Sequence, residues 1–167
     1  MVFLNIRNKK NKIFFSIKNE NFFSKIFILL IFTQITFGAF TSGLDAGKIY
    51  QSCPLINNYF FPDDLTYNDI IFPQVLSEPS FVQFIHRKLA YIIFIYVVIM
   101  SFLIFYRKQK EMYQSTFYLL TMIFVQIILG IFTLLSGAYI WIASLHQIST
   151  ILLLLSSIYF YYKTLKT

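Results

Sequence analysis

The sequence is poor in the residues from which most metal, redox and hydrolytic centres are built. Its 167 residues include one cysteine, Cys53, seven acidic residues and two histidines. A single cysteine excludes an intrachain disulfide and any site that needs several thiolates. The acidic residues and the histidines do not cluster along the sequence either, so a multi-carboxylate metal centre is not expected. Any metal chemistry must therefore use His86 and His146.

Charged residues are scarce as well, and apolar residues are abundant. Charged side chains make up 13% of the chain and hydrophobic ones 57%, compared with about 25% and 45–50% in soluble domains. A core of this size could not bury so much apolar side chain, which argues against a soluble enzyme domain. With five glycines and four prolines, a collagen-like or disordered chain is excluded.

Four apolar runs are long enough to span a bilayer, which requires about 20 residues. They cover residues 26–44, 81–105, 115–136 and 139–161. We therefore predict an all-α membrane protein whose four-transmembrane-helix bundle occupies residues 26–162. The same reading predicts a basic N-terminal arm at 1–25, an outer loop at 45–80 and a basic tail at 163–167.

The positive charges follow the predicted membrane topology. They flank the apolar runs and form no element that could read a nucleic-acid groove, so nucleic acid is not an expected partner. If the N-terminus is inside, 11 of the 14 Lys and Arg residues lie inside and only Lys48, Arg87 and Lys88 lie outside or at the outer boundary. This asymmetry predicts that both termini face the cytoplasm or matrix. Residues 1–25 lack a signal-peptide pattern. A topology-setting arm is favoured over a mitochondrial presequence, because Arg and Ser are scarce there.

An internal repeat divides the chain into two similar parts. Residues 32–41 (FTQITFGAFT) and 124–133 (FVQIILGIFT) match at six of ten positions, with an offset of 92. Each stretch belongs to an outward-running predicted helix, which is followed by an inward-running helix with one histidine. The bundle is therefore predicted to consist of two repeated helix hairpins, an architecture whose core can hold a cofactor.

The two histidines are predicted to lie at the same depth. Counted from the helix ends at about 1.5 Å per residue, His86 and His146 are roughly 8–10 Å below the outer boundary. Gly38 and Gly130 fall in the same layer. Because ionisable groups inside a membrane are usually functional, we predict that the histidines ligate a heme iron from opposite faces and that the glycines leave room for the ring. Histidines that only hydrogen-bond between helices are the alternative.

The polar neighbours of this layer have more than one possible role. Gln34 and Gln126, one turn deeper than the glycines, are predicted to hydrogen-bond across the bundle. Arg87, next to His86, either pairs with heme propionates or extends to lipid headgroups, and Lys88 has the same two options. No side chain within the membrane is a candidate general base or nucleophile, so no catalytic residue is assigned.

Three stretches of the sequence resemble a known family. They are QITFGAFTSGLDAGKIYQSCPLINNYFFPDDL (34–65), VQFIHRKLAY (82–91) and GIFTLLSGAYIWIASLHQ (130–147). They resemble the C-terminal half of heme A synthase, in the form found in alphaproteobacteria and mitochondria. The resemblance extends over nearly all of residues 26–162.

The resemblance implies a function that this chain would share with a second half. Heme A synthase is an eight-helix membrane enzyme of two four-helix halves, and it oxidises heme O to heme A for cytochrome c oxidase. The C-terminal half holds a heme b that relays electrons, and its ligands match His86 and His146. The other half carries the substrate heme site, with a glutamate three residues before its first histidine, where this chain has Gln83. The resemblance therefore implies an oxidoreductase of the heme A synthase type that needs an N-terminal half or partner chain, which carries the substrate heme site, for catalysis.

Alternatives to this interpretation stay open. The chain could be a stand-alone membrane b-type cytochrome for electron transfer, a truncated non-catalytic remnant, or a small transporter or assembly scaffold that tolerates substitution of its histidines. The partners that the resemblance implies are the missing half, the lipid bilayer, heme O synthase and an electron donor. The expected location is the mitochondrial inner membrane or a bacterial plasma membrane.

Overall fold

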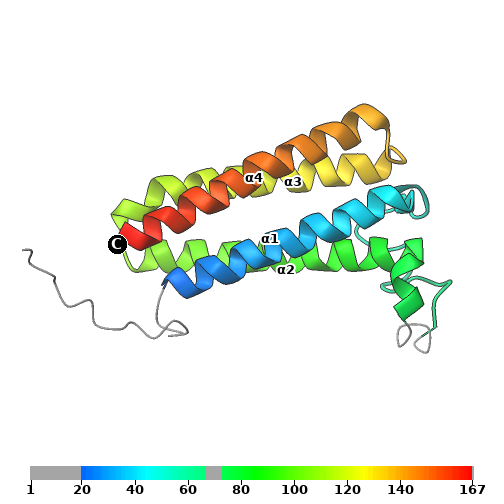
Figure 1. Ribbon diagram of the computed structural model, residues 1–167, viewed down its shortest axis with the longest axis horizontal. Coiled ribbons are helices and arrows are strands. Elements are labelled where there is room, and N and C mark those ends of the chain that lie inside the picture. The colour runs from blue at the N-terminus through cyan, green and yellow to red at the C-terminus, as the bar shows by residue number, and fades with distance from the viewer. Residues whose placement is uncertain (1–19, 67–72, 167) are drawn as a thin grey trace, which may run out of the picture.

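The computed structural model describes residues 20–66 and 73–166, and this part of the chain is folded into long helices without any β-strand (Figure 1). The four long helices are α1 (Glu20–Gly43), α2 (Pro79–Tyr106), α3 (Tyr113–Leu135) and α4 (Ile140–Lys166). Short 3-10 turns lie between them: η1 (Ala46–Lys48), η3 (Pro73–Ser77) and η4 (Lys110–Met112). All four long helices are long and apolar enough to cross a membrane. The predicted all-α membrane fold is confirmed.

The helices extend further than the apolar runs that predicted them. α1 begins at Glu20, so the last part of the predicted arm is helical, and α4 continues through the predicted tail to Lys166. Hydropathy marks where the chain is in hydrocarbon, whereas a helix continues into the interface, where charged side chains are solvated. Residues 1–19 of the arm, 67–72 of the outer loop and residue 167 lie outside the described residues.

The bundle is formed by two antiparallel hairpins. α1 packs against α2 and α4, and α3 packs against α4 and α2, so that the α1/α2 hairpin lies alongside the α3/α4 hairpin (Figure 1). The second hairpin closes in a tight turn, because Gly137 and Ala138 adopt positive φ values of 65° and 59°. Their backbone N–H groups bond to the carbonyls of Leu134 and Thr133, which is the Schellman pattern for ending a helix.

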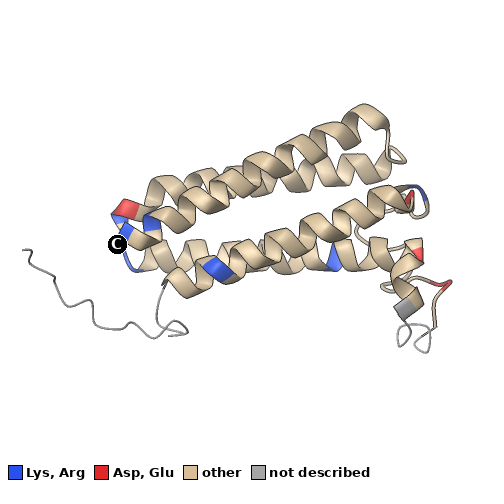
Figure 2. Ribbon diagram, in the orientation of Figure 1, with Lys and Arg blue, Asp and Glu red and all other residues tan. Residues whose placement is uncertain are grey.

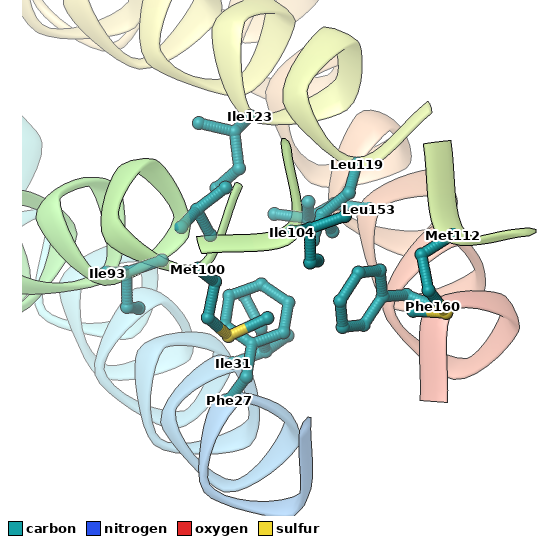
Figure 3. Packing of buried hydrophobic residues seen from close by; sticks show 11 residues of the cluster. Phe27, Ile31, Ile93, Met100, Ile104, Met112, Leu119, Ile123, Leu153 and Phe160 are labelled. Carbon is teal, nitrogen blue, oxygen red and sulfur yellow. The ribbon is translucent and has the colours of Figure 1, made fainter. Parts of the chain in front are cut away.

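The main cluster of buried apolar side chains, whose packing Figure 3 shows, lies in the half of the bundle near the C-terminus, which we call the inner half. Its members are Phe27, Ile31, Ile93, Val97, Met100, Ile104, Met112, Leu119, Ile123, Leu153 and Phe160. Its members nearest the α1–α2 loop end of the bundle are Ile31, Ile93, Ile123 and Leu153, which lie near the middle of their helices. Long apolar side chains on the opposite faces, such as Leu29 and Trp141, are 65% and 70% exposed, as expected for surfaces that contact lipid. The outer half therefore has a different interior.

Charges gather at the two ends of the bundle, and the balance between cations and carboxylates differs between the ends, although both signs occur at each (Figure 2). The end that holds the C-terminus and the α2–α3 turn is rich in cations: Lys25, Arg107, Lys108, Lys110, Lys163 and Lys166. The end that holds the α1–α2 loop carries Asp45, Asp63, Asp64 and Glu78. The separation follows the asymmetry seen in the sequence. Which end faces the cytoplasm or matrix stays a prediction.

Candidate functional site

A polar triad joins α1 to α2 in the outer half of the bundle. The side-chain Nε2 of Gln34 donates to the backbone oxygen of His86 over 3.1 Å, and the same nitrogen lies 3.4 Å from the Nε2 of the imidazole. Gly38, one turn further out on α1, faces the same ring. A Cβ at position 38 would lie 3.1 Å from the His86 Cε1. We call Gln34, Gly38 and His86 the first triad.

The second hairpin repeats this arrangement. Gln126 on α3 donates Nε2 to the backbone oxygen of His146 over 3.2 Å and lies 3.4 Å from its ring Nε2. A Cβ at Gly130 would again lie 3.1 Å from the histidine Cε1. We call Gln126, Gly130 and His146 the second triad. The repeat in the sequence is therefore also a repeat in the contacts of the two histidines.

The structure brings the two triads together in one layer. The two hairpins that carry the triads pack against each other through α1 with α4 and α2 with α3, and both triads lie on the outer side of the main apolar cluster. The Nδ1 atom of each imidazole is buried and has no hydrogen-bond partner among the described residues. Buried polar atoms are normally paired, so an unpaired nitrogen on each of two neighbouring rings points to a missing ligand.

Gln34 and Gln126 each bind the backbone of a histidine on the facing helix. The sequence predicted that Gln34 and Gln126 hydrogen-bond across the bundle, but it did not identify the histidines as their partners. The available signal was the spacing, because a residue four positions before a glycine shares its helix face. The glutamine and the glycine of each hairpin were therefore predictable as one group, whereas the histidine on the facing helix was not.

Arg87 has a role that the sequence did not predict. Its Nη2 donates to the backbone oxygens of Ser52, Pro54 and Leu55 at 2.7, 3.1 and 3.1 Å, so it holds the outer loop and does not extend to headgroups. Its Nη1 is buried and has no partner within the described part of the chain. Lys88 lies over the Phe60 ring, with Nζ 3.2 Å from the centroid, in a cation–π contact.

Further contacts fix the outer loop above the triads. Gln83, which is 2% exposed, donates to the backbone oxygens of Ala46 and Tyr50 at 2.8 and 3.1 Å. The Tyr50 hydroxyl donates to Asp63 and Asp64 over 2.8 Å each. Burial raises the pKa of the Tyr50 phenol, and its hydrogen bonds to the two carboxylates raise this pKa further. Gln83, three residues before His86, therefore binds the backbone of the outer loop.

Comparison with known proteins assigns the family. The sequence profile of COX15-CtaA, described as cytochrome oxidase assembly protein, matches residues 2–158. The chain belongs to the COX15-CtaA family. A heme A synthase of Pelagibacter ubique is 44% identical over 149 residues, which cover 89% of this chain and 44% of that protein. Heme A synthases of Wolbachia pipientis wMel and Rickettsia africae are 37% and 36% identical and cover 93% and 84% of this chain.

This member of the COX15-CtaA family spans less than half the length of these curated relatives, between 41% and 44% of each. No solved structure matches it significantly. Within residues 20–66 and 73–166, no group of three or more His, Cys, Asp or Glu could hold a bare metal ion. The pair formed by His86 and His146 instead suits a metal whose other ligands come from a cofactor, as in heme.

Proposed function

We propose that the chain is the heme-binding C-terminal half of a heme A synthase and takes part in oxidising heme O to heme A for cytochrome c oxidase biogenesis. The relatives named heme A synthase support the reaction, and their greater length supports the assignment to one half. The observation that carries the proposal for this half is the doubled Gln–Gly–His triad. Each triad sets one intramembrane imidazole against a glycine and leaves one ring nitrogen unpaired.

The residues of the two triads divide the work of binding. His86 and His146 would hold the iron as neutral imidazoles, the form of histidine that binds metals. Gly38 and Gly130 keep the space beside each imidazole free of side-chain atoms. Arg87 offers its unpaired Nη1 to an anionic group such as a propionate, while Nη2 stays on the loop. A heme b held by these two histidines would supply one-electron transfer.

The substrate chemistry is assigned to the part of heme A synthase that these 167 residues do not cover, or to a partner chain. After Glu20, the four long helices contain no Asp or Glu. Gln83 stands where the family's N-terminal half has a glutamate, and its amide donates hydrogen bonds to the loop backbone. The chain therefore offers no intramembrane carboxylate as a general base. The further partners proposed are heme O synthase and an electron donor, in a mitochondrial inner membrane or a bacterial plasma membrane with both termini on the matrix or cytoplasmic side.

A stand-alone b-type cytochrome is the second candidate. The observation that favours it is that the four long helices have no carboxylate after Glu20. The two histidines would therefore hold a heme that has no acid–base group beside it. The two candidates differ in what co-expression with a separate N-terminal half would produce. Heme A formation that requires both chains supports the synthase, whereas electron transfer without heme A formation supports the cytochrome.

The ligand assignment is tested by reconstituting the purified chain with heme b. The wild-type chain is expected to give the sharp Soret and α bands of a six-coordinate, low-spin heme, and His86→Ala and His146→Ala are each expected to replace them with the broader bands of a five-coordinate heme. Gln147→Ala is the matched control, because Gln147 adjoins His146 and its side chain makes only a 3.5 Å contact to Ser42. A spectrum unchanged in both histidine variants, or no heme uptake by the wild type, overturns the assignment.

A further inference from the structure

The two triads differ in what holds their glutamines. Ser149 and Thr150, three and four residues after His146, contact Gln126: Thr150 Oγ1 accepts from its Nε2 over 2.6 Å, and Ser149 donates to its Oε1. The corresponding positions after His86 are Leu89 and Ala90, which have no such groups. The Oε1 of Gln34 is accordingly buried without a partner among the described residues.

This difference changes which atoms receive the amide hydrogens. A glutamine amide carries two N–H donors, and its nitrogen must face the histidine backbone oxygen, which can only accept. In the second triad, the two hydrogens have oxygen acceptors in His146 and Thr150. In the first triad, only the backbone oxygen of His86 is available, so the second hydrogen is left for the ring Nε2 at 3.4 Å.

In both triads the amide nitrogen lies 3.4 Å from the ring Nε2, but only in the first triad does the second amide hydrogen lack an oxygen acceptor. That hydrogen opposes metal ligation by His86. If iron binds Nε2, it needs the lone pair that the Gln34 amide occupies. If iron binds Nδ1, the ring proton moves to Nε2 and faces the amide donor. The side chain of Gln34 must therefore move or lose a hydrogen bond when His86 ligates iron, whereas Gln126 keeps its oxygen partners when His146 does.

We propose that the two histidines are inequivalent ligands: His146 is the permanent ligand, and His86 is an exchangeable one whose release is controlled by the positioning residue Gln34. This inference rests on the proposed heme site. It assigns the chain a position at which a small molecule can reach the iron on the His86 side. The opposite side stays closed by His146 with Ser149 and Thr150.

Carbon monoxide is a suitable probe, because it binds a reduced six-coordinate heme only after one histidine has left. In the reduced, heme-loaded chain, we expect Gln34→Leu to slow carbon monoxide binding by roughly two- to tenfold, the equivalent of one hydrogen bond. Leu89→Ser with Ala90→Thr, which gives Gln34 the partners of Gln126, is expected to slow it as well. Ser149→Ala with Thr150→Val, which releases Gln126, is expected to speed it.

The identity of the exchangeable histidine is tested separately. The carbon monoxide complex of the wild type is expected to share its spectrum with that of His86→Ala and to differ from that of His146→Ala. Equal rates in Gln34→Leu, in the Leu89/Ala90 double variant and in the wild type overturn the proposal, as does a wild-type complex that matches His146→Ala. A chain that takes up no heme shows no Soret band, so failure of the proposed function is recognised before any rate is measured.

Discussion

Each imidazole lies against a helix backbone because the facing residue is glycine. A Cβ at position 38 or 130 would be 3.1 Å from the histidine Cε1, closer than ordinary van der Waals contact. The ring would have to move, although its glutamine holds it in place. The two glycines therefore set the position of the rings as directly as the residues that bond to them.

Substitution of these glycines tests this reading. Gly38→Ala and Gly130→Ala are each expected to weaken heme binding by about 1–3 kcal/mol, the usual cost of overpacking, when binding is measured by heme titration. Gly43→Ala is the matched control on the same helix as Gly38, because a Cβ there meets nothing within 4 Å. An equal loss of affinity in all three variants would show that general helix effects, and not contact with the imidazoles, are responsible.

Tyr50 gives the outer loop a dependence on alkaline pH. Its pKa is raised in the folded chain by burial and by the bonds to Asp63 and Asp64. As pH rises past about 10, the ordinary pKa of tyrosine, the unfolded chain loses this proton and the folded chain keeps it. The free energy of unfolding must then fall.

We expect thermal unfolding in detergent to show this fall between pH 9 and about 11. In Tyr50→Phe the fall should be smaller, although this variant is less stable at neutral pH because it lacks the hydroxyl hydrogen that Asp63 and Asp64 share. The difference between the two chains isolates Tyr50 from the other tyrosines. Parallel pH curves for the two chains would contradict the assignment.

One face of α2 holds the outer loop through residues at helical spacing. Ser80, Gln83 and Arg87, at positions i, i+3 and i+7, share this face. Ser80 contacts Asp64, Gln83 reaches the backbone of Ala46 and Tyr50, and Arg87 reaches that of residues 52–55. The same helix therefore carries His86 and the anchors of the loop that covers the histidine layer.

Loss of these anchors is expected to free the loop without unfolding the bundle. Gln83→Leu with Arg87→Met should speed amide hydrogen exchange in residues 46–56, while exchange in α3 and α4 stays unchanged. Lys88→Met is the control, because Lys88 makes a cation–π contact with Phe60 and donates no hydrogen bond to the loop backbone in the described contacts. Unchanged exchange in the double variant would contradict the anchoring role.

The sequence predicted the four helices and missed much of the loop, for a physical reason. Hydropathy along about 20 residues is a local signal, so the spans are readable from composition alone. The partners of Gln83 and Arg87 lie more than 30 residues away in the chain, and their acceptors are backbone oxygens that no side chain reveals. The layer of histidines and glycines was predictable because each half of the internal repeat has one glycine and one histidine at matching positions. The glutamine contacts were only half predicted, because their partner depends on how the helices rotate.

The charge distribution of the whole bundle predicts how it is inserted. Cys53 is the single cysteine and is exposed in the loop at the acidic end. If the cation-rich end faces the cytoplasm or matrix, a membrane-impermeant maleimide should label Cys53 only from the opposite side. In Cys53→Ser combined with Lys166→Cys, labelling should occur only from the cytoplasmic or matrix side. Labelling of both sites from the reversed sides would contradict the predicted topology.

The main apolar cluster lies in the inner half of the bundle, so the two halves would depend differently on a cofactor. The inner half is packed by apolar side chains from all four long helices. In the outer half, the Nδ1 atoms of two imidazoles have no hydrogen-bond partner among the described residues. A ligand that binds only the folded state adds its binding free energy to stability. If heme binds at the proposed site, it should therefore stabilise the outer half more than the inner half.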